Sequence, residues 1–345
     1  MFTPPILQDL TNPVLLAQLQ LALNNKTKPL GSLGELEALA IQLGVILQTE
    51  SPRLTSPQLV VFAADHGLAK HGISAYPSDV TWQMVENFLT GGAAVSVLAR
   101  QHQIALTVAD CGVMHHFAAQ PGLYNCKIAY GTADTLTQPA MSIEQCGQAL
   151  SNGQALINTL PGNALLLGEM GIGNTSAASL LLARLSGLPL EQCIGAGTGL
   201  DQDGIQRKTK ILQQVLQRHP DATEPLQALA AFGGFEIATM VGAIVAAAAS
   251  NRVIVVDGFI TSAAVLIASR LDPLVLQRCV FSHRSAERGH ALLFEQLGAR
   301  PLLDLQLRLG EGSGAALAWP LLVSACSVLT QMASFTSARV SPASS

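Results

Sequence analysis

The middle of the chain repeats short apolar runs, each of which ends in a polar or glycine-containing turn and is followed by a stretch with helical periodicity. The five runs cover residues 59–64, 104–109, 164–168, 252–256 and 279–281. Apolar runs of this length that alternate with helices are typical of parallel strands, because βαβ crossovers bury such strands on both faces. The pattern therefore predicts an α/β fold built on a parallel sheet.

Charged and polar side chains follow these runs directly. They are Asp65, His66, Asp110, Glu169, Asp257, His283 and Arg284. In open parallel sheets the ligand lies beyond the carboxyl ends of the strands. We therefore expect a binding site at this edge, although the pattern leaves the separate roles of Asp65, Asp110, Asp257 and His283 open.

Helical periodicity dominates the first 50 residues. Apolar positions at 15, 16, 19 and 23, and again at 33, 36, 39, 41 and 43, predict two helices. Lys28, in the loop between them, could reach a phosphate, although a solvated loop lysine is the commoner interpretation. Residues 237–249 form an apolar, Ala-rich stretch shorter than the roughly 20 residues that a membrane span needs, which favours a buried core helix. Residues 337–345 are small and polar and predict a disordered tail.

The composition narrows the class of protein. Charged residues make up 12% of the 345 residues and hydrophobic residues 49%, which suggests extra surface hidden in an oligomer. A net charge of -4 and only two Trp and three Tyr argue against nucleic-acid binding. No basic-then-apolar leader is visible, so we expect a cytoplasmic protein. The six cysteines lack any C-x-x-C pair, which favours reduced thiols and no metal site.

Glu311 is the first candidate for catalysis. It lies between Gly310 and Gly312, and an apolar run that Ser313 could cap follows it. Partial burial raises a glutamate pKa above its reference of about 4.3, which suits a general base near neutrality. The alternative is an ordinary helix entry, where Glu311 favours the positive end of the helix dipole.

A loop at residues 168–176 combines a carboxylate, Glu169, with two glycines, Gly171 and Gly173, and the hydrogen-bonding side chains of Asn174 and Thr175. Such a loop can hold a sugar hydroxyl with Glu169 and a phosphate with its backbone amides. A plain helix cap would explain Asn174 or Thr175 but not the whole loop.

A second glycine turn, at residues 195–199, precedes a helix expected from about Asp201, and Lys208 in that helix could neutralise a phosphate. Leu200 breaks the dinucleotide fingerprint, and a Walker loop fails because Ile205 follows Gly204. A methyltransferase-type turn and a solvated face for Lys208 remain alternatives.

Residues 72–85 form a loop and a helix in which Ser74, Tyr76, Gln83 and Met84 could line a flat aromatic pocket. Routine packing is the alternative for Tyr76 and Met84. The adjacent pair at residues 115–116 is interpreted as exposed loop histidines, because neighbouring side chains point apart on regular elements.

Taken together, these segments resemble the nicotinate-nucleotide:dimethylbenzimidazole phosphoribosyltransferases, which make the lower-ligand nucleotide of cobalamin. The similar stretches follow family order and cover residues 27–37, 64–85, 168–176, 197–208, 232–243, 256–264, 282–290 and 307–317. Two positions depart from the family pattern: Leu30 replaces a proline, and Ala196 replaces a frequent arginine of the phosphate turn.

The resemblance implies a Rossmann-like parallel sheet flanked by helices in a large domain, residues 55–305. A small helical domain would comprise residues 1–54 and 306–336. It also implies a homodimer, no cofactor, Glu311 as catalytic base, Glu169 at the site, and Ser74 and Gln83 in the benzimidazole pocket. The full expected substrate-binding set is Ser74, Tyr76, Gln83, Met84, Gly171, Gly173, Asn174, Thr175, Gly197, Thr198, Gly199, Lys208, Ser285 and Gly310.

The implied chemistry needs one base. Nicotinate leaves neutral from the cationic pyridinium of nicotinate mononucleotide, whereas 5,6-dimethylbenzimidazole must lose a proton as it attacks the anomeric carbon. No pyrophosphate leaves, so no magnesium clamp is expected. A Rossmann-type methyltransferase and a non-catalytic azole or nucleotide binder are the alternative functions.

Overall fold

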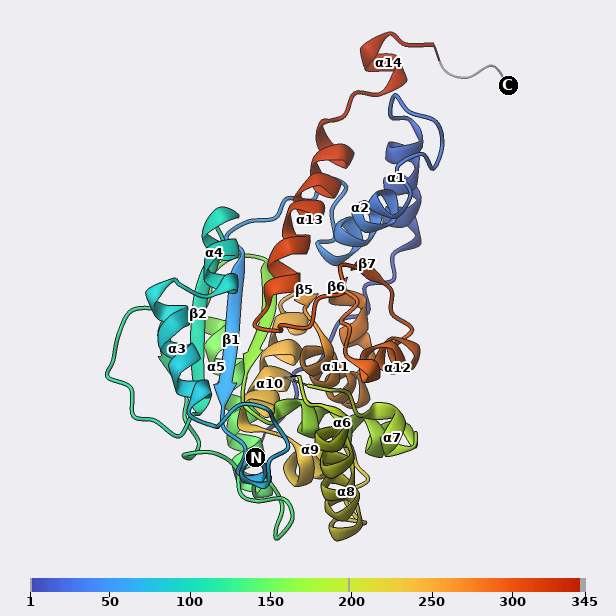
Figure 1. The fold of residues 1–345 in the computed structure, drawn as a ribbon. Coiled ribbons are helices and arrows are strands. Elements are labelled where there is room, and N and C mark those ends of the chain that lie inside the picture. The colour runs from blue at the N-terminus through green and yellow to red at the C-terminus, as the bar shows by residue number, and fades with distance from the viewer. Residues whose placement is uncertain (1, 198, 342–345) are drawn as a thin grey trace.

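A single parallel sheet forms the centre of the protein (Figure 1). The computed structural model describes residues 2–197 and 199–341. The sheet has seven strands in the order β3-β2-β1-β4-β5-β6-β7. Their bounds are β1 Gln58–Ala64, β2 Ala105–Gly112, β3 Leu123–Asn125, β4 Ala164–Met170, β5 Val253–Val256, β6 Cys279–His283 and β7 Pro301–Leu303. The predicted α/β fold is confirmed, as are the five predicted strands; the edge strands β3 and β7 were not predicted.

The order of the strands places the site. The chain runs outward from β1 to β2 and β3, and then returns to β4 on the other side of β1. Ligand crevices form where the direction of winding reverses in this way, beyond the carboxyl ends of the central strands. In this protein that position lies beyond β1 and β4.

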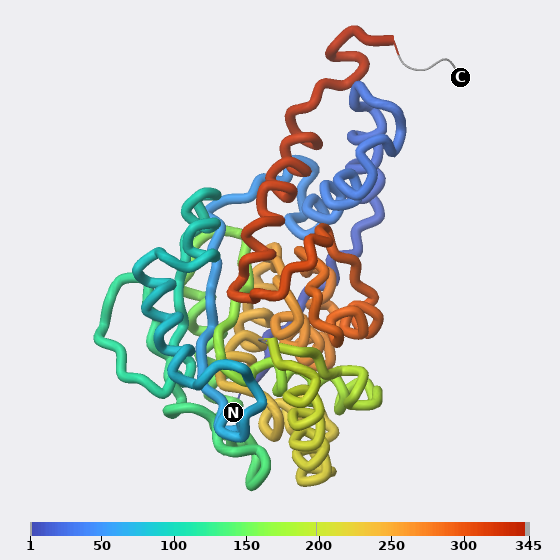
Figure 2. Tube along the Cα trace, in the orientation of Figure 1, coloured from blue at the N-terminus to red at the C-terminus, as the bar shows by residue number. Residues whose placement is uncertain are grey.

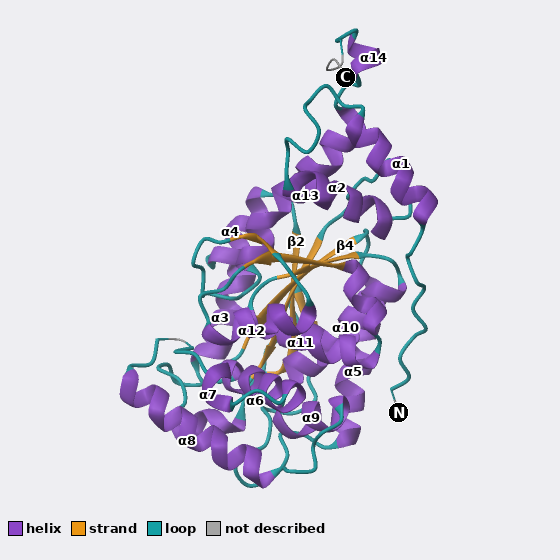
Figure 3. Cartoon of the chain, turned by 90° about the vertical axis from the view of Figure 1, so that its right-hand side faces the viewer, coloured by secondary structure: helices purple, strands orange, loops and turns teal. Residues whose placement is uncertain are grey.

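Helices cover both faces of the sheet (Figure 3). Alternate residues of β1 point to opposite faces, so Val60 and Phe62 join one buried apolar cluster and Leu59 and Val61 join another. The first cluster includes α5 Ile143–Thr159, α6 Asn174–Ser186, α7 Leu190–Cys193, α8 Gln202–Arg218, α9 Pro225–Phe232, α10 Phe235–Ala249, α11 Phe259–Leu271 and α12 Arg288–Leu297. The second includes α1 Pro13–Asn24, α2 Glu35–Ile46, α3 Val80–Thr90, α4 Ala94–Gln101 and α13 Ser313–Gln331.

Helix α10 is the core helix that its Ala-rich sequence predicts. It packs against α5 so closely that a Cβ added at Gly153 would lie 1.9 Å from the carbonyl oxygen of Thr239. A Cβ at Gly242 would lie equally close, 1.9 Å, to the carbonyl oxygen of Leu150. Glycine is therefore required at both positions, and the contact between the two helices is a contact of backbones.

The segments from the two ends of the chain lie side by side, with α1 and α2 beside α13 (Figure 2). The backbone N–H of Thr27 donates to the carbonyl oxygen of Ala333 at 3.1 Å. Because these helices share one apolar cluster with a face of the sheet, the division into residues 55–305 and residues 1–54 plus 306–336 stays a prediction.

The sequence context of Lys28 suggested a solvated loop lysine, but the structure shows that Lys28 is buried. Its ammonium lies 2.8 Å from the Glu37 carboxylate, and both side chains are buried. Glu37 stands in the first turn of α2, the element that follows the loop. The buried carboxylate draws Lys28 inward, because a buried charge requires a partner.

Helix α14, Phe335–Ala338, extends into the segment predicted to be disordered from residue 337. The hydroxyl of Ser334 accepts a hydrogen bond from the backbone N–H of Ser337, and the Ser337 hydroxyl accepts one from the backbone N–H of Ser334. This capping box explains why a helix forms where disorder was predicted, because it gives hydrogen-bond acceptors to backbone N–H groups that would otherwise lack them. Residues 342–345 of the predicted tail lie outside the described residues.

Two 3-10 helices, η1 Gly67–His71 and η2 Pro273–Arg278, complete the elements that the structure describes. Among the described residues, α13 is the one helix long and apolar enough to cross a membrane, and 56% of that window is buried against the rest of the protein. All six cysteines are buried, and the described residues contain no disulfide.

Candidate active site

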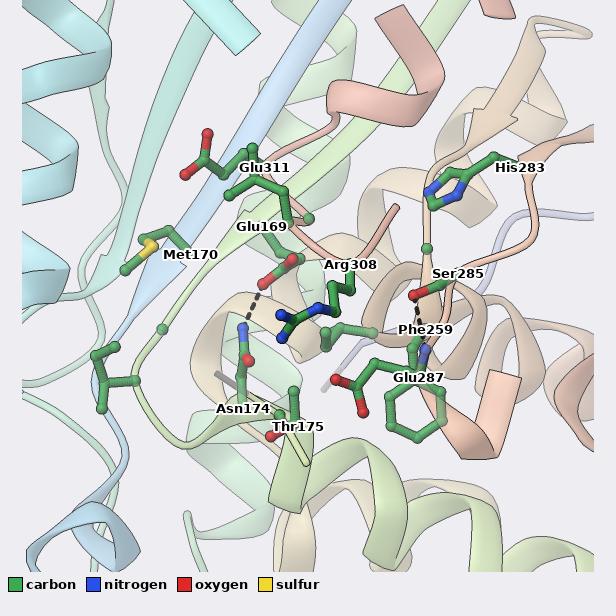
Figure 4. A pocket seen from close by; sticks show the side chains of 17 residues that line it. Glu169, Met170, Asn174, Thr175, Phe259, His283, Ser285, Glu287, Arg308 and Glu311 are labelled. Carbon is green, nitrogen blue, oxygen red and sulfur yellow. Dashed lines mark hydrogen bonds between the residues drawn. The ribbon is translucent and has the colours of Figure 1, made fainter. Parts of the chain in front are cut away.

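A pocket opens beyond the carboxyl ends of β4, β5 and β6, on the β4 side of the point between β1 and β4 where the winding reverses, and the turn before α13 closes one side of it (Figure 4). Residues from five separate segments meet there. The lining residues are Glu169, Met170, Gly171, Ile172, Asn174, Thr175, Gly197, Gly258, Phe259, Ile260, His283, Ser285, Glu287, Arg308, Leu309, Gly310 and Glu311.

The turn that carries Glu311 has an unusual backbone. Gly310, Glu311 and Gly312 all adopt positive φ, with values of 80°, 65° and 86°. Glycine tolerates this region, but a glutamate there is strained and needs support from its surroundings. A Cβ added at Gly168 of β4 would lie 2.4 Å from the carbonyl oxygen of Glu311, so the turn rests directly on the strand. Ser313 does not cap α13; its hydroxyl donates to the carbonyl oxygen of Gly310 at 2.7 Å.

The Glu311 side chain is buried in the pocket wall, with 6% of its surface exposed. Its Oε2 has no hydrogen-bond partner among the described residues. Burial, reinforced by the negative charge of Asp257, raises the pKa of Glu311 to about 7. An unpartnered carboxylate with such a pKa can accept a proton near neutrality.

Glu169, at the end of β4, is the second buried carboxylate of the pocket. The side-chain amide of Asn174 donates to its Oε2, and the backbone of Glu311 also hydrogen-bonds to it. Burial and the charge of Asp257 nevertheless raise the pKa of Glu169 to about 8. In Figure 4 this carboxylate faces Asn174, whereas that of Glu311 points toward the side where Met170 lies.

Lys208 lies behind the pocket wall and does not line the pocket. It is fully buried on α8, and its ammonium donates to the hydroxyl of Thr175 at 3.0 Å, so it does not belong to a solvated face. A Cβ at Gly197 would lie 3.4 Å from this ammonium, which places Lys208 directly under the glycine turn. Burial lowers the pKa of Lys208 to about 8, although the charge of Glu287 opposes this effect.

The other described residues of the glycine turn at 195–199 do not line the pocket. Asp201 caps α8 by accepting a hydrogen bond from the backbone N–H of Gly204 at 2.8 Å, as the predicted helix start requires. Gly199 does not line the pocket, and Thr198 lies outside the described residues.

The segment at residues 72–85 lies beside the pocket but does not line it. Gln83 is exposed, 54% of the Tyr76 surface is exposed, and Met84 packs against the apolar cluster of α3. Neither Ser74 nor Gly173 lines the pocket. The segment is nevertheless attached to the pocket wall, because the backbone N–H of Ile172 donates to the Thr81 hydroxyl at 3.1 Å.

The strand-end aspartates of β1 and β2 hold loops instead of facing the pocket. The Asp65 carboxylate accepts a hydrogen bond from the backbone N–H of Met114 at 2.7 Å. The Asp110 carboxylate accepts one from Val113 and lies 3.0 Å from the Lys127 ammonium. His115 stacks on the ring of Trp82, and the described residues contain no group of three or more His, Cys, Asp or Glu placed to hold a metal ion.

A family model described as Phosphoribosyltransferase matches residues 10–340. A protein of Variovorax paradoxus (strain S110), named nicotinate-nucleotide–dimethylbenzimidazole phosphoribosyltransferase, is 64% identical over 339 residues, which cover 98% of this chain and 97% of that one. A protein of the same name from Cupriavidus necator is 58% identical over 330 residues and covers 95% of each chain. The chain belongs to this family.

The fold agrees with that membership. The crystal structure of CobT from Thermus thermophilus superposes with a TM-score of 0.91 at 40% identity, covering 96% of this chain and 100% of that one. Membership in the phosphoribosyltransferase family and the Rossmann-like α/β fold, both expected from the sequence resemblance, are therefore confirmed.

Sequence reasoning missed several residues that line the pocket. Its apolar wall includes Met170, Ile172, Phe259, Ile260 and Leu309. Arg308 and Glu287 add charges of opposite sign, and Arg308 points between Asn174 and Glu287 in Figure 4. All of these lie close in sequence to a glycine turn or strand end that the sequence did mark, so position next to a motif was the available signal.

Proposed function

We propose that this chain transfers the 5-phosphoribosyl group of nicotinate mononucleotide to 5,6-dimethylbenzimidazole, giving α-ribazole 5′-phosphate and nicotinate. The proposal rests on family membership and on one observation of the site. That observation is the buried carboxylate of Glu311, whose Oε2 lacks a partner in the part of the chain that the structure describes.

The donor phosphate is assigned to the turn at Gly197 and the start of α6. The hydroxyl of Thr175 and the backbone at Gly197 line the pocket, and the ammonium of Lys208 lies immediately behind both. Helix N-termini and glycine turns favour bound phosphate because their N–H groups are free to donate. Lys208 would add a positive charge from a dry position, where its attraction is weakly screened.

The ribose and the departing nicotinate are assigned to the centre of the pocket, beside Glu169. Positive charge develops on the sugar as the bond to nicotinate breaks, and an ionised Glu169 would stabilise it. The cationic pyridinium of the bound donor lowers the pKa of a neighbouring carboxyl and so favours this ionised form. Nicotinate then leaves with the bonding electron pair and is neutral at its ring nitrogen.

The acceptor is assigned to the side of the pocket toward which Glu311 points. One nitrogen of dimethylbenzimidazole attacks C1′ of the ribose on the face opposite nicotinate, which gives the α-linked product. The N–H proton of its other nitrogen passes to the Glu311 carboxylate. Ser74, Tyr76, Gln83 and Met84 are kept as acceptor-side residues in this proposal, on the strength of the contact between Thr81 and Ile172.

A homodimer and a cytoplasmic location complete the proposal. Large apolar side chains are exposed on the first helix and the loop after it, including Val14 at 69%, Leu21 at 60% and Leu30 at 74%. Burial against a second copy would remove this surface from water. Light scattering should give a mass of about twice 36.0 kDa; a mass of one chain at micromolar concentration would contradict the dimer.

The decisive experiment incubates the purified protein with nicotinate mononucleotide and dimethylbenzimidazole and separates the products by chromatography. We expect free nicotinate and an α-linked nucleotide in equal amounts. Binding of both substrates without nicotinate release would instead indicate a non-catalytic binder. Thermal protection by S-adenosylmethionine but not by nicotinate mononucleotide would indicate a methyltransferase.

A further inference from the structure

Asp257, directly after β5, is tied to the backbone that carries Glu311. One carboxylate oxygen accepts a hydrogen bond from the backbone N–H of Gly312 at 3.2 Å, and the other accepts one from Ala315 at 3.0 Å. Asp257 is 1% exposed, and no side chain of α13's own N-terminal segment caps the helix. A carboxylate from a distant segment therefore caps the first turn of α13.

These two hydrogen bonds act on a strained turn. Three successive residues with positive φ precede α13, and such a backbone persists only where contacts outside it fix its position. The contact between Gly168 and the carbonyl oxygen of Glu311 limits how far the turn can move toward β4. Asp257 restrains the turn from a second strand end, because it binds the residue after Glu311.

His283, at the end of β6, in turn holds Asp257. Its Nε2 lies 3.6 Å from the nearer oxygen of Asp257, and its side chain is 2% exposed. A Cβ added at Gly314 would lie 1.9 Å from Cδ2 of His283, so the ring packs against the backbone of α13. The aspartate and the histidine thus form one buried pair beneath the turn.

We propose that Asp257, supported by His283, is the positioning residue for Glu311, because it fixes the turn that carries the Glu311 carboxylate. The inference rests on the proposed role of Glu311 as the general base. Asp257 does not line the pocket, so it acts through Glu311 and not on substrate.

Charge supports the same role. The negative charge of Asp257 raises the pKa of Glu311, after burial, because a second anion nearby disfavours ionisation. The charged or titratable groups that line the pocket itself are Glu169 from β4, His283 from β6, Glu287 from the loop before α12, and Arg308 from the segment of Glu311 itself. Asp257 differs from them because its carboxylate also accepts a hydrogen bond from the backbone N–H of Gly312, the residue after Glu311.

The test compares kcat–pH profiles of the wild type and Asp257→Asn. The variant removes the charge and replaces one acceptor oxygen by a donor. We expect kcat above pH 8 to fall about tenfold, while KM for nicotinate mononucleotide changes less than about twofold. The midpoint of the acid limb should move down by about half a pH unit, because the pKa of Glu311 falls when the nearby charge is lost.

Asp272→Asn is the matched control. Asp272 also caps a helix, accepting a hydrogen bond from the backbone N–H of Leu274 at 2.9 Å, but it lies at η2 and not in the pocket. Its profile should match the wild type. An Asp257→Asn profile that also matches the wild type, in both kcat and midpoint, would overturn the proposal.

A second variant covers the case in which Asp257→Asn does not fold, as judged by circular dichroism. His283→Asn leaves Asp257 in place but removes the ring that supports it and that can carry a positive charge. We expect kcat to fall about threefold and the acid midpoint to rise; wild-type values would refute the positioning role. Near-normal turnover of Glu311→Gln would refute the base itself, whereas an inactive Glu311→Gln with an unaffected Asp257→Asn refutes only the positioning role.

Discussion

The end of β4 and the turn before α13 each bring one buried glutamate to the same pocket. The two glutamates differ in backbone conformation and in the hydrogen bonds that their carboxylates receive. Glu169 stands on a regular strand and receives hydrogen bonds from Asn174 and from the backbone of Glu311. Glu311 stands on a strained turn, and its Oε2 receives no hydrogen bond within the described residues. The two carboxylates have similar burial but opposite degrees of satisfaction.

This difference in hydrogen bonding indicates two different roles in the reaction. Hydrogen-bond donors fix the orientation of Glu169, which suits a group that stabilises charge by staying in place. The free oxygen of Glu311 is available to a proton, and its pKa of about 7 lies nearer to neutrality than that of Glu169, which is about 8. The hydrogen bonds that each carboxylate already receives therefore distinguish the expected role of Glu169 from that of Glu311.

The largest expected effect tests that distinction directly. Glu311→Gln should lower kcat by about 10²–10⁴-fold, because it removes the proton acceptor, and Glu169→Gln should lower it by about tenfold. Steady-state assays of nicotinate release would measure both. The exposed Glu295, replaced by Gln, is the control. An equal or larger loss in Glu169→Gln would reverse the assignment.

Gly168→Ala tests the contact between β4 and the turn that carries Glu311. The added methyl would lie 2.4 Å from the carbonyl oxygen of Glu311, so the turn must shift. We expect a loss of about 1–3 kcal/mol in the free energy of unfolding and a loss of up to about 10²-fold in kcat. Urea denaturation and initial rates would measure these two quantities.

Gly147→Ala is the control for that variant. Gly147 lies within α5, where the nearest atom to an added Cβ is the backbone nitrogen of Phe2 at 3.7 Å. Alanine should stabilise this helix by about 0.5–1 kcal/mol. Unchanged kcat in Gly168→Ala would show that the turn does not depend on its contact with β4.

Lys208→Met should produce a smaller effect and one confined to the donor. Loss of the buried positive charge near Thr175 should raise KM for nicotinate mononucleotide about tenfold, or about 1.4 kcal/mol, with little change in KM for the acceptor. Lys210→Met, on the exposed side of the same helix, is the control. Equal effects of the two variants would mean that Lys208 acts only through the overall charge of α8.

The smallest effect is the change in kcat between pH 8 and pH 7. A base with a pKa of about 7 is mostly ionised at pH 8 and half ionised at pH 7, so kcat should fall about twofold over that interval. The loss continues about tenfold per unit at lower pH, because only the ionised form accepts a proton. A kcat that stays constant down to pH 5 would exclude Glu311 as the titrating group.

The sequence was sufficient to predict the elements whose pattern is local. Apolar runs identified the strands that form most of the sheet, and glycine-rich turns identified Glu169, Gly197 and Glu311 before any geometry was known. Edge strands β3 and β7 escaped because three residues carry too little periodicity to detect.

Interactions between distant segments could not be predicted in the same way. Asp257 follows β5 like several other strand-end acids, and nothing local shows that it binds the backbone 55 residues further on. The burial of Lys28 and Lys208 likewise depends on partners from other elements, Glu37 and Thr175. Residue type and local pattern describe a lysine, but tertiary packing decides whether water reaches it.

The position of α13 along the chain has a consequence for biosynthesis. This helix packs against β4 and β6 and shares an apolar cluster with one face of the sheet, yet it is among the last segments to leave the ribosome. Until it emerges, the part of that face over β4 and β6 stays uncovered, and nascent chains with such exposed surfaces aggregate readily. A premature stop codon before residue 310 should therefore yield insoluble protein in addition to removing the turn that carries Glu311.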